Sequence, residues 1–166
     1  MRGREESVST DLALKYIKYL CDAYIVHKVE RFEIRGKRLL ESNEKYDFED
    51  AGIRNTQTMV GRDKNIKKVI ENIIYQQLIN NGYKVYVDQL QGGEIDFVCT
   101  KGPSRIYVQA SYLIASEQTR EREFGALKKI KDNYPKYVIS MTPLVTKTDD
   151  DGIVHLSLRE FLVKGL

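Results

Sequence analysis

The feature that most constrains the fold is a change of hydrophobic period near Gly82. Before it, the apolar residues from Ile66 to Leu78 recur at helical spacing and form one stripe, which ends at Asn80-Asn81-Gly82. After it, three segments have strand-like content and are separated by glycine-containing turns. A chain that changes from one long amphipathic helix to consecutive short strands is expected to pack that helix against a sheet.

The rest of this part of the chain continues in the same way. Ser116 is a good cap for a second amphipathic helix, which Asn133-Tyr134-Pro135 ends. A further strand follows, and the right-handed crossover rule places it parallel to a neighbour. We therefore predict an α/β domain over residues 63–166 with a mixed sheet flanked by helices. The strands are expected at 83–90, 94–99, 105–113, 136–141 and 153–158, with a solvated loop at 147–152 and a closing helix at 159–166.

The N-terminal part has a different pattern. A capped helix is predicted over about Asp11–Asp22, and two strand-like segments flank the basic turn Arg35-Gly36-Lys37. A helix followed by a long hairpin with a basic tip is typical of the second half of a winged helix, without the two helices that normally precede it. We assign residues 1–62 to this partial winged-helix segment and expect the chain to be a piece of a longer protein.

Composition narrows the class of protein. The 166 residues are 42% hydrophobic and 31% charged, with a net charge of +3, which suits a globular protein. The longest apolar run is far below the ~20 residues of a membrane span, and the N-terminus is polar, so we expect a cytoplasmic protein with no membrane span. Cys21 and Cys99 are expected to be buried, reduced thiols, and His27 and His155 to lie on strand surfaces rather than on a metal.

One group of polar residues could carry chemistry. Strict alternation would put Glu94, Asp96 and Val98 on one face of their strand, and Ile95, Phe97 and Cys99 on the other. In the next strand Gln109 and Ser111 share a face, and Glu71 borders the apolar stripe of the long helix. These side chains could converge where two strands meet a helix. The predicted site residues are Glu71, Asp96, Gln109 and Ser111.

The order of these residues resembles the PD-(D/E)xK, or restriction-endonuclease-like, superfamily. The segments ENIIYQQLINNGYKVYV, EIDFV, YVQASY and GIVHLSLREFLV, with others along 11–166, resemble more closely the C-terminal domain of a group of prokaryotic AAA-type ATPases. In that family a winged-helix remnant and a nuclease-like domain follow an ATPase module. The resemblance implies an ATPase domain. No phosphate-binding G-x-x-x-x-G-K-[ST] motif occurs in this sequence, so we expect the ATPase domain either on a longer form of the same chain or on a partner chain.

The resemblance also assigns roles to the four site residues. Glu71 matches the acid of the helix, and Asp96 matches the metal-binding aspartate. Gln109 stands where the superfamily has Asp or Glu, and Ser111 stands where it has Lys. Glu71, Asp96 and Gln109 would then be the ligands of a Mg²⁺ ion, the cofactor such a site could hold. Replacement cations could come from the following helix, at Arg120, Arg122, Lys128 and Lys129.

Three functions follow from this site. With one carboxylate replaced by an amide and the lysine by a serine, we expect a nuclease-like, non-cleaving, nucleic-acid-binding domain that needs no cofactor and is not an enzyme. The first alternative is a divergent Mg²⁺-dependent DNA endonuclease. The second is a protein-interaction or regulatory module of the ATPase without a nucleic-acid role. The residues predicted to contact DNA are Lys15, Lys18, Arg31, Arg35, Lys37 and Arg38.

Overall fold

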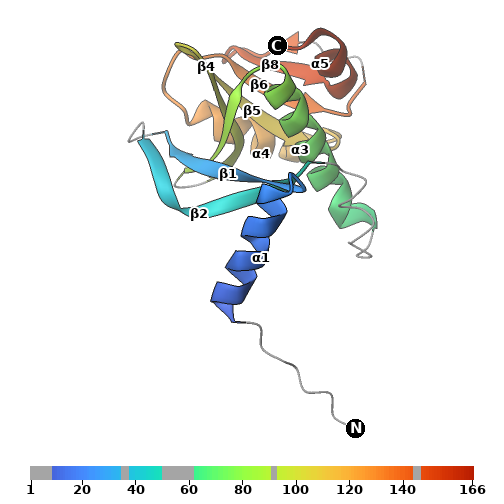
Figure 1. The fold of residues 1–166 in the computed structure, drawn as a ribbon. Helices are drawn as coiled ribbons and strands as arrows, with labels where there is room; N and C mark the ends of the chain where they lie inside the picture. Colours follow the sequence, from blue (N-terminus) through green and yellow to red (C-terminus); the bar gives the residue numbers. More distant parts are fainter. Residues whose placement is uncertain (1–8, 35–37, 50–61, 91–92, 144–146) are drawn as a thin grey trace.

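The computed structural model of the chain describes residues 9–34, 38–49, 62–90, 93–143 and 147–166. These residues form four helices and eight strands in a mixed α/β arrangement (Figure 1). The helices are α1 (Thr10–Asp22), α3 (Arg62–Asn80), α4 (Glu117–Lys128) and α5 (Leu158–Lys164). The strands are β1 (Val26–Glu33), β2 (Arg38–Phe48), β3 (Lys84–Leu90), β4 (Gly93–Lys101), β5 (Ser104–Ser111), β6 (Lys136–Ser140), β7 (Lys147–Thr148) and β8 (Ile153–Ser157).

All eight strands belong to one sheet, in the order β2-β1-β3-β4-β5-β6-β8-β7. The strands β3, β4 and β5 form the antiparallel meander predicted from the turns. After α4, β6 pairs parallel to β5, which confirms the predicted crossover, and β8 pairs parallel to β6. The segment 147–152 was predicted to be only a solvated loop. This was wrong in part, because Lys147 and Thr148 pair with β8 as a short edge strand.

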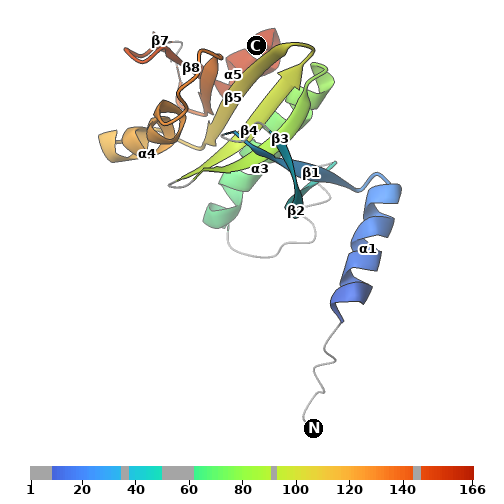
Figure 2. The same cartoon turned by 90° about the vertical axis from the view of Figure 1, so that its left-hand side faces the viewer.

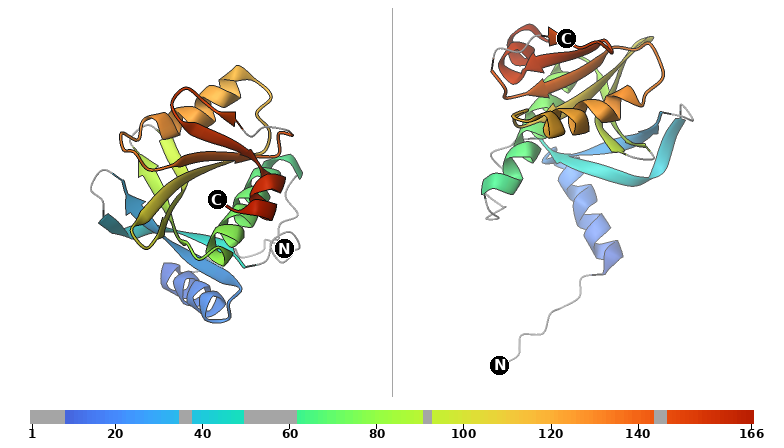
Figure 3. Two further views of the ribbon diagram at one scale, coloured as in Figure 1. Left: turned by 90° about the horizontal axis from the view of Figure 1, so that it is seen from above. Right: turned by 180° about the vertical axis from the view of Figure 1, so that it is seen from behind.

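The two faces of the sheet carry separate hydrophobic cores. Helices α3 and α5 cover one face, where α3 contributes Ile70, Ile74 and Leu78 and α5 contributes Phe161. Helix α4 covers the other face with Phe124, Leu127 and their neighbours. Figures 2 and 3 show α4 on the side of the sheet opposite α3. A sheet covered by helices on both faces needs apolar residues on both sides of its central strands, and β4 and β5 have them.

The N-terminal hairpin is part of this sheet. Strand β1 pairs antiparallel with β2 and parallel with β3, where Arg31 lies opposite Val87. Val29 of β1 packs in the core beneath α3, and Phe32 packs in the core beneath α4. The predicted boundary at residue 62 therefore separates two segments that hydrogen-bond to each other within one sheet.

Helix α1 stands apart from the rest of the molecule. It projects away from the sheet beyond the β1–β2 hairpin in every view (Figures 1–3), and none of its residues is buried. Ser9 caps it by accepting a hydrogen bond from the Leu12 amide. No helix among the described residues is long and apolar enough to cross a membrane.

Cys99 and His27 lie as expected, whereas Cys21, which was expected to be buried, and His155 do not. Cys21 is half-buried and Cys99 is buried, and both are free thiols. Burial raises the pKa of the Cys99 thiol well above its usual range. The expectation that His155 lies on a strand surface was wrong, because β8 is covered by α4 and only 3% of His155 is exposed.

Candidate functional site

A β-bulge in β4 sets the direction of Asp96. Tyr86 of β3 pairs with Val98 of β4, and Asp88 of β3 pairs with Ile95 of β4. The step between these two pairs is two residues along β3 but three residues along β4. The extra residue in β4 interrupts the alternation of its side chains. As a result, Val98 and Ile95 both pack on the α4 face, and Phe97 packs on the α3 face. The sequence-based assignment of Asp96 and Val98 to one face was therefore wrong, and the bulge explains the error.

The bulge turns Asp96 towards α3 and Glu71. Lys67 lies one helical turn before Glu71, and its Nζ is 3.7 Å from Glu71 Oε1 and 3.9 Å from Asp96 Oδ2. Lys45 of β2 reaches Glu71 Oε2 at 3.3 Å. Two of the four predicted site residues thus meet here, and the two carboxylates share a lysine.

Both carboxylates are largely removed from solvent, with side chains 12% exposed for Glu71 and 11% for Asp96. The Ala110 amide donates a hydrogen bond of 2.9 Å to Asp96 Oδ2. Burial, and next the nearby charge of Glu71, raise the pKa of Asp96 to about 7, against the lowering effects of Lys67, the Ala110 amide and Lys45. Asp96 therefore exchanges a proton near neutral pH, which an ordinary surface aspartate does not do.

Gln109 and Ser111 do not join this pair. They lie on the opposite face of β5, where the Gln109 side-chain amide donates to Glu123 Oε2 of α4 at 3.0 Å. Gln109 Oε1 also accepts a hydrogen bond from the Asp96 backbone amide at 3.3 Å. Both residues are buried, 5% and 3% exposed respectively. Gln109 therefore links the bulge of β4 to α4, and its side chain faces away from Glu71.

The pocket around Glu71 and Asp96 is rich in cations. It has a volume of about 360 Å³ and is lined by residues of β1, β2, β3, β4 and α3. Val87 provides apolar wall, and Asp88, 3% exposed, is a third acidic residue of the lining. The cationic side chains of the lining are Arg31, Lys45, Lys67 and Lys68. We call this cavity the α3-face pocket.

The six predicted nucleic-acid contacts fall in four different places along the chain. Arg31 lines the α3-face pocket, whereas Lys15 and Lys18 are exposed on α1. Arg38 begins β2, where its backbone pairs with Glu33. Arg35 and Lys37 lie outside the described residues. Among the predicted residues whose side chains the structure describes, Arg31 is the one that lines the pocket with Glu71 and Asp96.

The cationic side chains beside Glu71 and Asp96 were predicted to belong to the helix that is α4. They belong instead to α3 and β2. Arg120, Arg122, Lys128 and Lys129 belong to α4 or its C-terminal cap, on the opposite face of the sheet. Lys67 could have been found from the sequence, because it precedes Glu71 by four residues on one helix. Lys45 could not, because its position depends on the pairing of β2 with β1 and on the pairing of β1 with β3.

The donor set does not fit a Mg²⁺ site. Mg²⁺ requires several oxygen ligands in a near-octahedral arrangement. Glu71 and Asp96 already have Lys45 and Lys67 as counter-charges, and the third predicted ligand, Gln109, faces the other side of the sheet. Within the described ranges no three His, Cys, Asp or Glu side chains are grouped so that they could hold a metal ion.

Comparison with known proteins gives one sequence relative of substantial similarity. No family model matches the chain. The chain is 34% identical over 150 residues to a protein of Haemophilus influenzae that is described only as uncharacterized, and the alignment covers 90% of this chain and 36% of that protein. The chain therefore spans little more than a third of the relative's length.

One solved structure is also similar, at a low level. The crystal structure of protein VC1899 from Vibrio cholerae aligns with 95% of this chain and 43% of that chain, with 11% sequence identity and a TM-score of 0.38. These values are too low for the similarity to support an argument about fold or function.

Proposed function

We propose that this chain is a nuclease-like, non-cleaving, nucleic-acid-binding domain. The observation that carries the proposal is the α3-face pocket, where four cationic side chains from β1, β2 and α3 line the same cavity as the partly buried carboxylates of Glu71 and Asp96. A phosphodiester backbone is bound chiefly by Lys and Arg side chains of this kind. The order of helix, hairpin and strands around the pocket supports a restriction-endonuclease-like sheet preceded by a partial winged helix.

The charge balance of the pocket favours an anionic ligand. The four cations outnumber the three acidic residues of the lining, Glu71, Asp88 and Asp96, even when all three are ionised. Because the pKa of Asp96 is raised to about 7, that side chain carries only part of its charge at neutral pH. An incoming phosphate would therefore meet a net positive surface, and protonated Asp96 could donate a hydrogen bond to it.

The absence of cleavage follows from the positions of the remaining residues. A hydrolytic site of this superfamily needs a second metal-binding carboxylate and a lysine on the strand that β5 represents. Gln109 and Ser111 occupy those positions, are buried on the α4 face, and do not reach the pocket. The pocket can thus hold a phosphate group without the ligands that would activate water.

The test is a gel-shift titration of the chain with labelled duplex and single-stranded DNA at low salt. We expect retardation by the wild type and weaker binding by Lys68→Gln, because Lys68 is exposed and lines the pocket. Lys131→Gln, an equally exposed lysine after α4, is the matched control and should bind like the wild type. Absence of retardation at low salt would contradict the proposal.

The second candidate is a divergent Mg²⁺-dependent DNA endonuclease. One observation favours it: Lys67 Nζ lies within 4 Å of both Glu71 and Asp96 and could replace the lysine missing at Ser111. Incubation of supercoiled plasmid with Mg²⁺ or Mn²⁺ distinguishes the two functions. We expect no nicking, whereas nicking that Asp96→Ala abolishes would establish the endonuclease.

The third candidate is an interaction module of an AAA-type ATPase in the cytoplasm. Helix α1 favours it, because several of its large apolar side chains are exposed. These are Leu12, Leu14, Tyr16, Tyr19 and Leu20. The chain covers only 36% of its Haemophilus influenzae relative, so a further domain beside α1 is compatible with the relative's length. Co-purification of this chain with a candidate AAA-type ATPase domain, lost in Leu14→Glu, would support it.

A further inference from the structure

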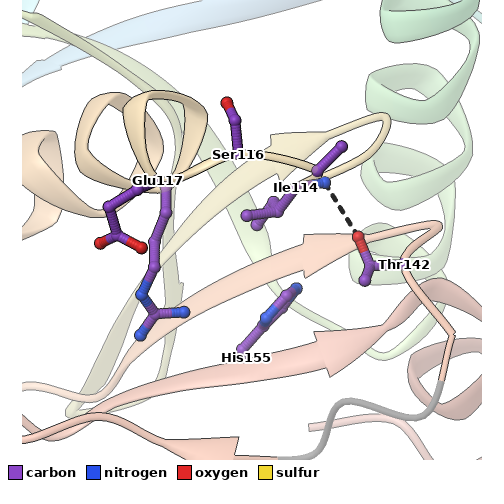
Figure 4. A pocket seen from close by; sticks show the side chains of 7 residues that line it. Ile114, Ser116, Glu117, Thr142 and His155 are labelled. Atoms are coloured by element: carbon purple, nitrogen blue, oxygen red, sulfur yellow. Dashed lines mark hydrogen bonds between the residues drawn. The ribbon is translucent and has the colours of Figure 1, made fainter.

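A second pocket lies on the other face of the sheet, beneath α4. It has a volume of about 310 Å³ and shares no lining residue with the α3-face pocket. Its walls come from residues 114–116 after β5, the first turn of α4, Thr142 after β6, and His155 of β8 (Figure 4). The three strands are parallel to one another, and crevices at the carboxyl ends of parallel strands are common ligand sites. We call this cavity the α4-face pocket.

A buried histidine in this pocket has an unused hydrogen-bonding atom. His155 is 3% exposed, and its Nδ1 is buried with no hydrogen-bond partner among the described residues. Its Nε2 is 2.8 Å from Ser140 Oγ, which also accepts a hydrogen bond from the Thr142 amide. Ser140 can therefore donate its hydroxyl hydrogen to Nε2, and in that arrangement the ring hydrogen lies on Nδ1.

The surroundings of the ring favour its neutral form. Burial, and next the charge of Arg120, lower the pKa of His155 below its usual range. A neutral ring with Nε2 as acceptor leaves Nδ1–H as a buried donor. A buried donor without a partner is costly, and an acceptor oxygen in the pocket, direct or through one water, would relieve that cost.

Three other features of the pocket suit an anion. Arg120 lies with its guanidinium carbon 4.1 Å from the centre of the Phe124 ring, and Phe124 in turn packs edge-on against His155. The same pocket contains the N-terminus of α4, capped by Ser116, where the helix dipole is positive. Thr142 Oγ1 accepts from the Ile114 amide, which leaves its hydroxyl hydrogen for another acceptor.

We propose that the α4-face pocket binds a phosphate group through Arg120, the N-terminus of α4, the Thr142 hydroxyl and the Nδ1–H of His155. The exposed carboxylate of Glu117 also lines the pocket and opposes the anion, so affinity is limited in the wild type. The proposal does not depend on the nucleic-acid function, because the two pockets lie on opposite faces of the sheet.

The test uses amide NMR spectra of the whole chain titrated with inorganic phosphate at constant ionic strength. We expect saturable shifts at residues 114–120 and 142. Arg120→Gln should weaken binding about tenfold, because hydrogen bonds to a charged group are lost. Glu117→Gln should strengthen binding about twofold, a gain that misfolding cannot produce. Arg159→Gln, an exposed arginine of α5, is the matched control and should leave affinity unchanged.

Two further arms identify the source of the phosphate and the tautomer. A short oligonucleotide with a 5′-phosphate is compared with the same strand without it, and acetate replaces phosphate in a third titration. Stronger shifts with the 5′-phosphate would assign the pocket to a strand end, and equal shifts to free phosphate. Nitrogen spectra should show the Nδ1–H form of His155. Shifts that do not saturate, or that Arg120→Gln leaves unchanged, would overturn the proposal.

Discussion

At the scale of single residues, Asp96 has an unusual environment for an aspartate. It is a carboxylate placed by a bulge beneath α3, beside another carboxylate and two lysines. Burial raises its pKa more than the lysines lower it, and the result is a pKa of about 7. A group with such a pKa binds a proton more tightly in the folded than in the unfolded chain, so it links stability to pH.

Asp96→Asn should change the pH dependence of stability. Between pH 3.8, the ordinary pKa of an aspartate, and about pH 7, Asp96 of the folded wild type holds a proton that the unfolded chain has released. Its stability contribution is therefore complete below pH 4 and is lost as pH rises through 7, with a slope of at most about 1.4 kcal/mol per pH unit. The stability of the Asp96→Asn variant does not fall in this way with pH, because asparagine does not titrate. Its side-chain oxygen can still accept the hydrogen bond from the Ala110 amide.

Urea unfolding of the wild type and of Asp96→Asn from pH 4 to pH 8 measures this pH dependence of stability. The difference in unfolding free energy, Asp96→Asn minus wild type, should rise with pH and level off above about 7. A difference that is constant across this range would mean that the pKa of Asp96 is not raised.

Gln109 has a structural role in joining β4 to α4. Its side chain accepts from the Asp96 amide and donates to buried Glu123. Gln109→Leu would leave both groups buried without this partner, which costs about 1–3 kcal/mol for each group. Gln118→Leu, at an exposed position of α4, should change stability by less than about 0.5 kcal/mol. Equal unfolding free energies for the two variants would contradict the role of Gln109.

At the scale of elements, most of the secondary structure could be predicted from the sequence. The predicted helix over 11–22 corresponds to α1, and Ser116 caps α4 as expected. The side-chain faces of β4 could not be predicted, because alternation holds only for a strand without a bulge. The bulge is visible only in the pairing of β4 with β3. Lys67 follows from helical spacing, whereas Lys45 depends on long-range strand pairing.

The cap of α4 gives a prediction for that element. Ser116 Oγ accepts from the Thr119 amide at 3.2 Å, so Ser116→Ala leaves a first-turn amide without its partner. We expect a loss of about 1 kcal/mol of stability, measured by urea unfolding. Ser104→Ala, at an exposed position at the start of β5, is the control. If Ser116→Ala is as stable as the control, the capping interaction contributes nothing.

At the scale of the whole molecule, the hairpin and the C-terminal segment form one sheet. Phe32 of β1 packs in the α4-face core, 5.9 Å from the Tyr86 ring and 4.6 Å from the guanidinium carbon of Arg105. This contact joins the predicted winged-helix segment to the predicted nuclease-like domain. Composition and local sequence pattern could not predict how residues 1–62 pack against residues 63–166, because the Phe32 contact joins residues that are far apart in the sequence.

Phe32→Ala should therefore destabilise the whole chain. We expect a loss of about 3–5 kcal/mol and one cooperative transition that near-UV and far-UV circular dichroism report at the same urea concentration. Tyr24→Ala, where the side chain is 77% exposed, should have little effect. Two separate transitions in the wild type would show that residues 1–62 and 63–166 unfold independently.

The central claim is that the α3-face pocket binds a nucleic-acid backbone. The most direct test is the slope of log affinity against log salt concentration, measured by fluorescence anisotropy with duplex DNA. The account predicts that Lys68→Gln lowers this slope by about one and weakens binding to all sequences alike, while Lys131→Gln keeps the wild-type slope. A slope that Lys68→Gln leaves unchanged would contradict the account, because the bound phosphates would then lie elsewhere on the protein.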